Sequence, residues 1–248
     1  MRLNKILKYH LYFLLSFLII SCGNNSEIEI LDEVEVEEII EDVVIIENDT
    51  INILALGDSY TIGQSVCAKC RFPEQLIDSL KQRNDSLDLN LKIIATTGWT
   101  TTNLINAIDS QNINANFDLV TLLIGVNNQY RGLPFATFEE EFPILVDKAI
   151  KAVNLDRNKL IVLSIPDYAY TPFGNGNTTI SSEIEKYNNH IELYCQTNSI
   201  TFLNITDITQ EGLSNPDYVA SDGLHPSKEA YTEFVKRLLP LATQKLGL

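Results

Sequence analysis

The stretch Ile51–Thr61, INILALGDSYT, joins a short apolar run to a Gly-Asp-Ser sequence. The run Ile53–Leu56 has the length and residue types of a buried parallel strand. We expect Gly57 to let the backbone turn sharply where this strand ends. Because ligands of open α/β sheets bind outside the carboxyl ends of the strands, Ser59 would be placed to act as a nucleophile. The alternative is that Asp58 and Ser59 only cap the next helix.

Strand-like and helix-like segments alternate along the rest of the chain. Further strands are predicted at Leu91–Ala95, Asp118–Ile124, Lys159–Ile165 and Ile200–Leu203, and helices at Pro73–Arg83, Thr100–Ser110, Phe138–Val153, Ser181–Gln196 and Ser227–Lys245. Residues 168–179 and 217–226 are predicted to be loops. This alternation predicts one α/β domain over residues 51–248, with about five mainly parallel strands and helices on both faces of the sheet.

The charge of the chain is strongly acidic and unevenly distributed. The 248 residues carry a net charge of −15, and residues 27–49 alone hold eleven acidic side chains and no basic one. The chain has no basic patch, which argues against nucleic acid as a partner. We interpret residues 22–50 as an acidic flexible linker held extended by self-repulsion, with a sorting signal or an interaction tail as the alternative.

The N-terminus has the pattern of a targeting segment. A basic start is followed by the apolar run Leu11–Ile20 and then by Ser21-Cys22. This pattern resembles the cleavage box of bacterial lipoproteins, which implies a signal peptide at residues 1–21 and lipidation of Cys22. An ordinary signal peptide with a nearby cysteine is the alternative. Either way we expect export, and the resemblance implies a lipid-anchored, extracytoplasmic protein of the bacterial cell envelope, on its periplasmic or surface face.

A general base for a serine nucleophile must come from very few residues. The chain has only three histidines. His10 lies in the leader, and His190 lies within a predicted helix, where a surface or satisfied histidine is the usual case. His225 follows Asp222 by three residues in a Gly-containing turn, so the carboxylate can reach the imidazole Nδ1 and fix its tautomer. An ordinary Asp-Gly turn with an exposed histidine is the alternative.

Four short blocks, in order, carry a family resemblance. Gly57–Thr61, Gly98, Gly125–Asn128 and Asp222–Pro226 resemble the conserved blocks of the SGNH, or GDSL-like, hydrolases. The resemblance covers about residues 51–245 and implies a three-layer, flavodoxin-like fold. It departs at Asn128, where the family usually has Asp, and this leaves the local hydrogen bonds in doubt.

The resemblance also implies roles for individual residues. Ser59 would be the nucleophile, His225 the general base and acid, and Asp222 the residue that orients it. The N–H groups of Ser59 and Gly98 and the side-chain amide of Asn127 would form the oxyanion hole. The family uses no metal and no organic cofactor. For Asn127, a purely structural role in a turn is the alternative.

The expected reaction is cleavage of acyl or acetyl carboxylic esters, possibly on carbohydrate, through an acyl-enzyme. The expected partners are a small-molecule or glycan ester and the membrane, and we expect a monomer. A non-catalytic glycan-binding or structural surface lipoprotein with the same fold is the alternative. We expect the walls of the site to come from loops 64–72, 99–102, 129–135 and 168–179, which carry Trp99, Tyr130, Arg131, Tyr168, Tyr170 and Phe173. The alternative is that these side chains only cover the core.

The loop after the nucleophile carries Cys67 and Cys70. In an exported protein a local disulfide is the leading interpretation. Two free thiols are the second interpretation. A thioredoxin-like redox role is disfavoured because no matching βαβ unit precedes the motif, and a zinc site is disfavoured because the chain offers too few further cysteine ligands.

Overall fold

The computed structural model describes residues 50–248. The predicted signal peptide, the lipidation site Cys22 and all but the last residue of the predicted linker lie outside the described residues.

Five parallel strands form one sheet, in the order β2-β1-β3-β4-β5. The strands are β1 (Ile51–Gly57), β2 (Leu89–Ala95), β3 (Leu119–Leu123), β4 (Leu160–Leu163) and β5 (Thr201–Leu203). All residues of β3 and β4 are buried, which explains their near-continuous apolar sequences. The order is that of flavodoxin-like folds, so the predicted α/β fold is confirmed. Its switch point lies between β1 and β3, which is where such sheets bind ligands.

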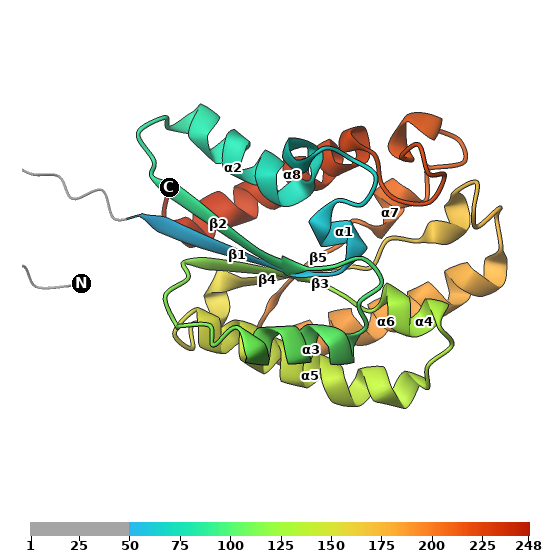
Figure 1. The fold of residues 1–248 in the computed structure, drawn as a ribbon, viewed down its shortest axis with the longest axis horizontal. Coiled ribbons are helices and arrows are strands. Elements are labelled where there is room, and N and C mark those ends of the chain that lie inside the picture. Colours follow the sequence, from blue (N-terminus) through green and yellow to red (C-terminus); the bar gives the residue numbers. More distant parts are fainter. Residues whose placement is uncertain (1–49) are drawn as a thin grey trace, which may run out of the picture. The chain divides into compact units, whose positions relative to one another are not determined.

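Helices cover both faces of the sheet, as Figure 1 shows. Helices α2 and α8 pack together on one face, and α3, α5 and α6 lie on the other. The helices are α1 (Ser59–Ile62), α2 (Phe72–Arg83), α3 (Thr101–Ser110), α4 (Val126–Tyr130), α5 (Phe135–Ala152), α6 (Thr178–Thr197), α7 (Thr206–Thr209) and α8 (Lys228–Leu246). Single 3-10 turns are η1 (Ala68–Cys70), η2 (Arg157–Lys159), η3 (Tyr168–Tyr170) and η4 (Pro216–Tyr218).

The long predicted elements all occur, with ends shifted by a few residues. The short helices α1, α4 and α7 were not predicted, because four or five residues show no helical period. Both α1 and α4 begin where a strand of the switch point ends, so these short helices are the elements that present the site. No helix of residues 50–248 has the length and apolar character needed to cross a membrane.

Aromatic side chains fill the layer between the sheet and helices α5 and α6. Phe138 packs against Phe142 and Tyr187, with ring centroids 5.3 and 4.7 Å apart. His190 lies edge-on to Phe135 and Phe138 in this cluster. His190 is therefore a packing residue, as its position within a helix predicts.

Candidate active site

Ser59 is the first residue of α1, and only Asp58 separates it from the end of β1. Asp58 provides the helix cap, because its Oδ1 accepts the Tyr60 N–H at 3.0 Å. The capping role that the sequence suggested for both residues thus falls to Asp58, and the Ser59 side chain lines a cavity instead. Gly57 has no positive φ, so a sharp turn is not what glycine supplies here. A Cβ at this position would lie 2.1 Å from Thr61 Oγ1 and 2.4 Å from the Leu123 carbonyl oxygen, so there is no room for any side chain here.

The carboxyl group of Asp58, which precedes Ser59, is fully buried. Burial raises its pKa to about 7, although hydrogen bonds from the Tyr60 N–H and the Asn127 side-chain amide act in the opposite direction. The Asp58 carboxyl does not border the cavity. It is therefore a buried support, which holds the Tyr60 N–H through Oδ1 and the Asn127 amide of the cavity wall through Oδ2.

Asp222 and His225 form a hydrogen-bonded pair in one turn. Asp222 Oδ2 lies 2.6 Å from His225 Nδ1, and Oδ1 accepts the N–H groups of Leu224 and His225 at 2.9 and 3.0 Å. Partial burial raises the pKa of the Asp222 carboxyl, but hydrogen bonds from Ser65, His225 and Leu224 outweigh it and hold the pKa well below its usual range. The carboxylate therefore stays ionised beside the imidazole at neutral pH.

The structure brings Ser59 and His225 into the wall of one cavity. Among residues 50–248, no hydrogen bond joins the Ser59 hydroxyl to the His225 ring. Catalytic hydrogen bonds are often long without substrate and shorten when it binds. The ring of Tyr60 lies edge-on to His225, with centroids 5.7 Å apart, and limits how far the imidazole can rotate.

The three candidate oxyanion donors border the same cavity. The N–H groups of Ser59 and Gly98 donate no hydrogen bond within residues 50–248, so both are available to a ligand. Gly98 has a φ of +83°, a conformation that side chains rarely adopt, and a Cβ there would crowd the Arg131 guanidinium at 3.2 Å. The Asn127 amide, in contrast, donates to the Trp99 carbonyl oxygen at 2.9 Å and to Asp58 Oδ2 at 3.4 Å, so it could reach an oxyanion only by exchanging one of these acceptors, of which Asp58 Oδ2 is the more distant.

Asn128 has a different role from its neighbour. Its Oδ1 accepts the Thr101 N–H at the start of α3, at 3.0 Å, and its Nδ2 donates to the Thr101 hydroxyl at 2.6 Å. The Thr101 hydroxyl in turn donates to Glu141 on α5. An amide can both accept and donate here, whereas a carboxylate can only accept. Because the Thr101 hydroxyl gives its proton to Glu141, it needs a donor on its other side, and the Asn128 amide supplies one.

The cavity has a volume of about 250 Å³ and a largely apolar wall. Four of the predicted wall residues line it: Tyr130, Arg131, Tyr168 and Phe173. Trp99 and Tyr170 do not line it, so these two predictions were wrong. Trp99 instead packs against the core, and Tyr170 borders a separate polar depression. Four further wall residues were not predicted from the sequence, although Tyr60, Val126 and Leu224 lie within the motif blocks and Thr97 precedes Gly98.

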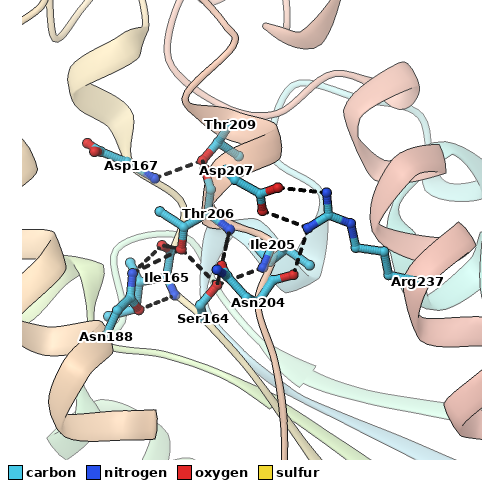
Figure 2. A network of polar contacts seen from close by, with 10 residues as sticks. All are labelled: Ser164, Ile165, Asp167, Asn188, Asn204, Ile205, Thr206, Asp207, Thr209 and Arg237. Atoms are coloured by element: carbon cyan, nitrogen blue, oxygen red, sulfur yellow. Dashed lines mark hydrogen bonds and ion pairs between the residues drawn. The ribbon is translucent and has the colours of Figure 1, made fainter.

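A polar network fixes the chain where β4 and β5 end (Figure 2). Asn188 of α6 accepts the Ile165 N–H at 2.7 Å and donates to the Ile165 carbonyl oxygen at 2.9 Å. Ser164 Oγ accepts the N–H groups of Ile205 and Thr206 at 2.8 and 3.1 Å. These contacts hold the segment that leads to Tyr168, so they set the position of one wall of the cavity.

The sulfurs of Cys67 and Cys70 form a disulfide in the loop that follows α1. The same loop reaches the Asp222–His225 turn through Ser65, whose hydroxyl donates to Asp222 Oδ2 at 2.6 Å. Nothing in the spacing of the sequence pointed to this contact, because 157 residues separate the two positions. No cluster of three or more His, Cys, Asp or Glu side chains suited to a metal ion occurs in the described part of the chain.

A doubly wound α/β domain with a serine and a histidine–aspartate pair at the carboxyl edge of its sheet has the arrangement expected of a serine hydrolase. The family of GDSL-like lipases and acylhydrolases matches residues 55–232. The chain therefore belongs to the GDSL-like lipase/acylhydrolase family, which is a family of carboxylic-ester hydrolases. No curated protein sequence matches the chain significantly.

Solved structures of this kind share the fold. The structure is similar to TesA, with a TM-score of 0.62 and 16% identity over 79% of this chain and 99% of that one. It is similar to the psychrotrophic esterase EstA from Pseudoalteromonas sp., with a TM-score of 0.58 and 18% identity, and the match covers 79% of this chain and 99% of EstA. A third similar structure is an acetyl xylan esterase from Geobacillus stearothermophilus, with a TM-score of 0.60 and 17% identity. The match covers 77% of this chain and 94% of that one.

Proposed function

We propose that this chain is a lipid-anchored, extracytoplasmic serine esterase that cleaves short acyl or acetyl esters. The observation that carries the proposal is the shared cavity, which Ser59, His225 and three oxyanion donors border together. The Asp222–His225 hydrogen bond adds the third member of a triad. A binding module that only retained the fold would have no need of these groups together.

In the proposed reaction, His225 Nε2 takes the Ser59 hydroxyl proton as Oγ attacks the ester carbonyl carbon. The N–H groups of Ser59 and Gly98 and the Asn127 amide stabilise the oxyanion. His225 then gives the proton to the leaving alkoxide, and an acyl-enzyme remains. A water molecule, deprotonated by the same nitrogen, releases the acid and restores Ser59. Asp222 holds the Nδ1 proton throughout and stabilises the imidazolium.

The cavity favours a small acyl group. Its volume of about 250 Å³ lies below the usual range of drug-sized ligand sites. Apolar side chains such as Val126 and Leu224 line it, and they suit an acetyl or short acyl chain. The exposed rings of Tyr130 and Phe173, beside Arg131, leave a mixed apolar and polar surface for the alcohol portion of the ester. That one structural neighbour is an acetyl xylan esterase agrees with an acetylated carbohydrate as substrate.

The lipid anchor is proposed from the Ser21-Cys22 box alone. The test is to express the full chain and its Cys22→Ala variant in a bacterium and to compare their partition between membrane and soluble fractions. Metabolic labelling with a fatty-acid analogue should mark the wild type and not the variant. Equal partition and equal labelling would show that Cys22 is not the anchor.

The activity is tested with p-nitrophenyl esters of graded chain length, on wild type, Ser59→Ala and Ser199→Ala. Ser199 is an exposed serine between α6 and β5 and serves as the matched control. We expect turnover of the acetyl and butyryl esters by wild type and Ser199→Ala, and loss of several orders of magnitude in Ser59→Ala. A fluorophosphonate should label Ser59. Undiminished hydrolysis by Ser59→Ala would disprove the assignment.

A further inference from the structure

Ser65 lies in the loop between α1 and η1, six positions after the proposed nucleophile. Its hydroxyl donates to Asp222 Oδ2 at 2.6 Å. The same oxygen faces His225 Nδ1 at 2.6 Å, whereas Oδ1 is occupied by the N–H groups of Leu224 and His225. The two oxygens of Asp222 are thus held by different parts of the chain. The turn of His225 holds Oδ1, and the nucleophile's own loop supports Oδ2.

The loop around Ser65 has an uncommon backbone conformation and is tied to its surroundings on both sides. Its φ is +67°, in the left-handed region that non-glycine residues seldom occupy. Such conformations persist where the surrounding structure enforces them. The neighbouring residue Gln64 accepts a hydrogen bond from the Thr97 hydroxyl at 2.6 Å, and the Cys67–Cys70 disulfide closes the following turn. The loop is therefore tied on both sides of Ser65.

Resting on the proposed function, we propose that Ser65 is a positioning residue of the catalytic acid. It fixes the Asp222 carboxylate so that Oδ2 faces the imidazole, and it links the nucleophile's loop to the histidine's loop. Its hydrogen bond also withdraws charge from Oδ2, which limits how strongly Asp222 stabilises the protonated histidine.

Other titratable groups surround Asp222 and His225, and none of them is substituted in the experiment below. Tyr60 of α1 packs against His225, and the buried phenol of Tyr231 on α8 lies near Asp222 and Asp58. The two cavities that His225 borders are also lined by Arg131, Asp167, Tyr168 and Tyr218. Since none of these groups contacts the Ser65 hydroxyl, a change at Ser65 acts through Asp222.

The experiment compares Ser65→Ala, Ser65→Gly and Ser65→Asn in the full chain, using kcat, KM and the pH profile of kcat/KM with a short p-nitrophenyl ester. In the Ala and Gly variants we expect kcat to fall roughly three- to tenfold, with KM within about twofold. The acidic midpoint of the profile should move to higher pH, because a carboxylate that has lost a donor favours the imidazolium more strongly. Asn tolerates positive φ and carries a donor, so it should restore much of the wild-type profile.

Ser199→Ala is the matched control, because Ser199 also has a positive φ, of 55°, and contacts neither loop. It should leave kcat and the profile unchanged. The glycine variant removes the hydroxyl without backbone strain, so it gives an answer even if the alanine variant folds poorly. Wild-type pH profiles in both Ser65→Ala and Ser65→Gly would overturn the inference. Ser59→Ala, run in parallel, separates the two proposals, because active Ser59→Ala would refute the proposed function itself.

Discussion

Asp222 Oδ2 lies 2.6 Å from His225 Nδ1, and the same carboxylate accepts the backbone N–H of His225 through Oδ1. One turn therefore fixes both Asp222 and His225, the proposed acid and base of the triad. The side chain of His225 is only 11% exposed, and it borders the cavity that Ser59 also lines. His225 can act as the proposed general base only if the hydrogen bond at Nδ1 selects the tautomer in which Nε2 carries no proton.

Asp222→Asn should therefore lower kcat by about 10³–10⁴, because an amide can donate to Nδ1 and trap the wrong tautomer. Steady-state kinetics on a short ester measure the loss. Asp217→Asn is the matched control, since Asp217 is exposed in the same segment and does not contact His225. If Asp222→Asn retained kcat within tenfold of wild type, another group would have to orient His225.

The Asn127 amide is a second separable element of the site. Asn127→Ala should lower kcat by about 10²–10³ with little change in KM, as expected for a lost oxyanion donor. Asn127→Asp should be worse than alanine, since a carboxylate would repel both the oxyanion and the Trp99 carbonyl oxygen, which the amide now contacts at 2.9 Å. Steady-state kinetics on the three proteins give the test. If Asn127→Ala and Asn127→Asp had kcat values close to that of wild type, Asn127 would have only a structural role in its turn.

The sequence predicted this fold because its strands are short, apolar and separated by helical segments of ordinary length. It also pointed to Ser59, which follows a buried strand, and to His225, which is one of only three histidines and lies three residues after Asp222. It could not place Ser65 against Asp222, since no local pattern reports a contact across 157 residues. Similarly, the pairing of Asn128 with Thr101 and Glu141 depends on how α3 and α5 pack. Periodicity predicts elements, whereas such contacts depend on their packing in three dimensions.

Asn128→Asp tests why this chain departs from the usual residue of its family. In wild type, the Thr101 hydroxyl accepts from Asn128 Nδ2 at 2.6 Å and donates to Glu141. An aspartate would leave two buried or half-buried carboxylates competing for one hydroxyl proton. We expect the free energy of unfolding to fall by about 1 to 3 kcal/mol in urea denaturation at pH 7.

Glu141→Gln provides the compensating change. A glutamine amide can donate to the Thr101 hydroxyl, which is then free to donate to Asp at position 128. The double variant should recover part of the lost stability, giving a favourable coupling energy in the double-mutant cycle. Strictly additive effects of the two substitutions would contradict the proposed network.

The Cys67–Cys70 disulfide should matter more for activity than for overall stability. A ring this small adds at most about 2 kcal/mol to the free energy of unfolding by the chain-entropy estimate. Because the disulfide borders the loop of Ser65, dithiothreitol should lower the kcat of wild type a few-fold. The Cys67→Ser/Cys70→Ser double variant should start at that lower kcat and not respond. An equal response of both proteins would place the effect of the reductant elsewhere.

Asp58 makes stability depend on pH around neutrality. Burial raises its pKa to about 7 in the folded chain, whereas an unfolded aspartate titrates near 3.9. The folded state thus binds the proton more tightly, so this group stabilises the fold most at low pH and progressively less as the pH rises from about 4 through 7. Relative to Asp58→Asn, wild type should lose about 2 to 3 kcal/mol of unfolding free energy between pH 5 and pH 8. Urea denaturation of both proteins at the two pH values measures this difference, in which the contributions of the other titrating groups cancel. If the difference between the two proteins were the same at both pH values, Asp58 would be ionised throughout, and the buried turn beneath Ser59 would carry a full negative charge.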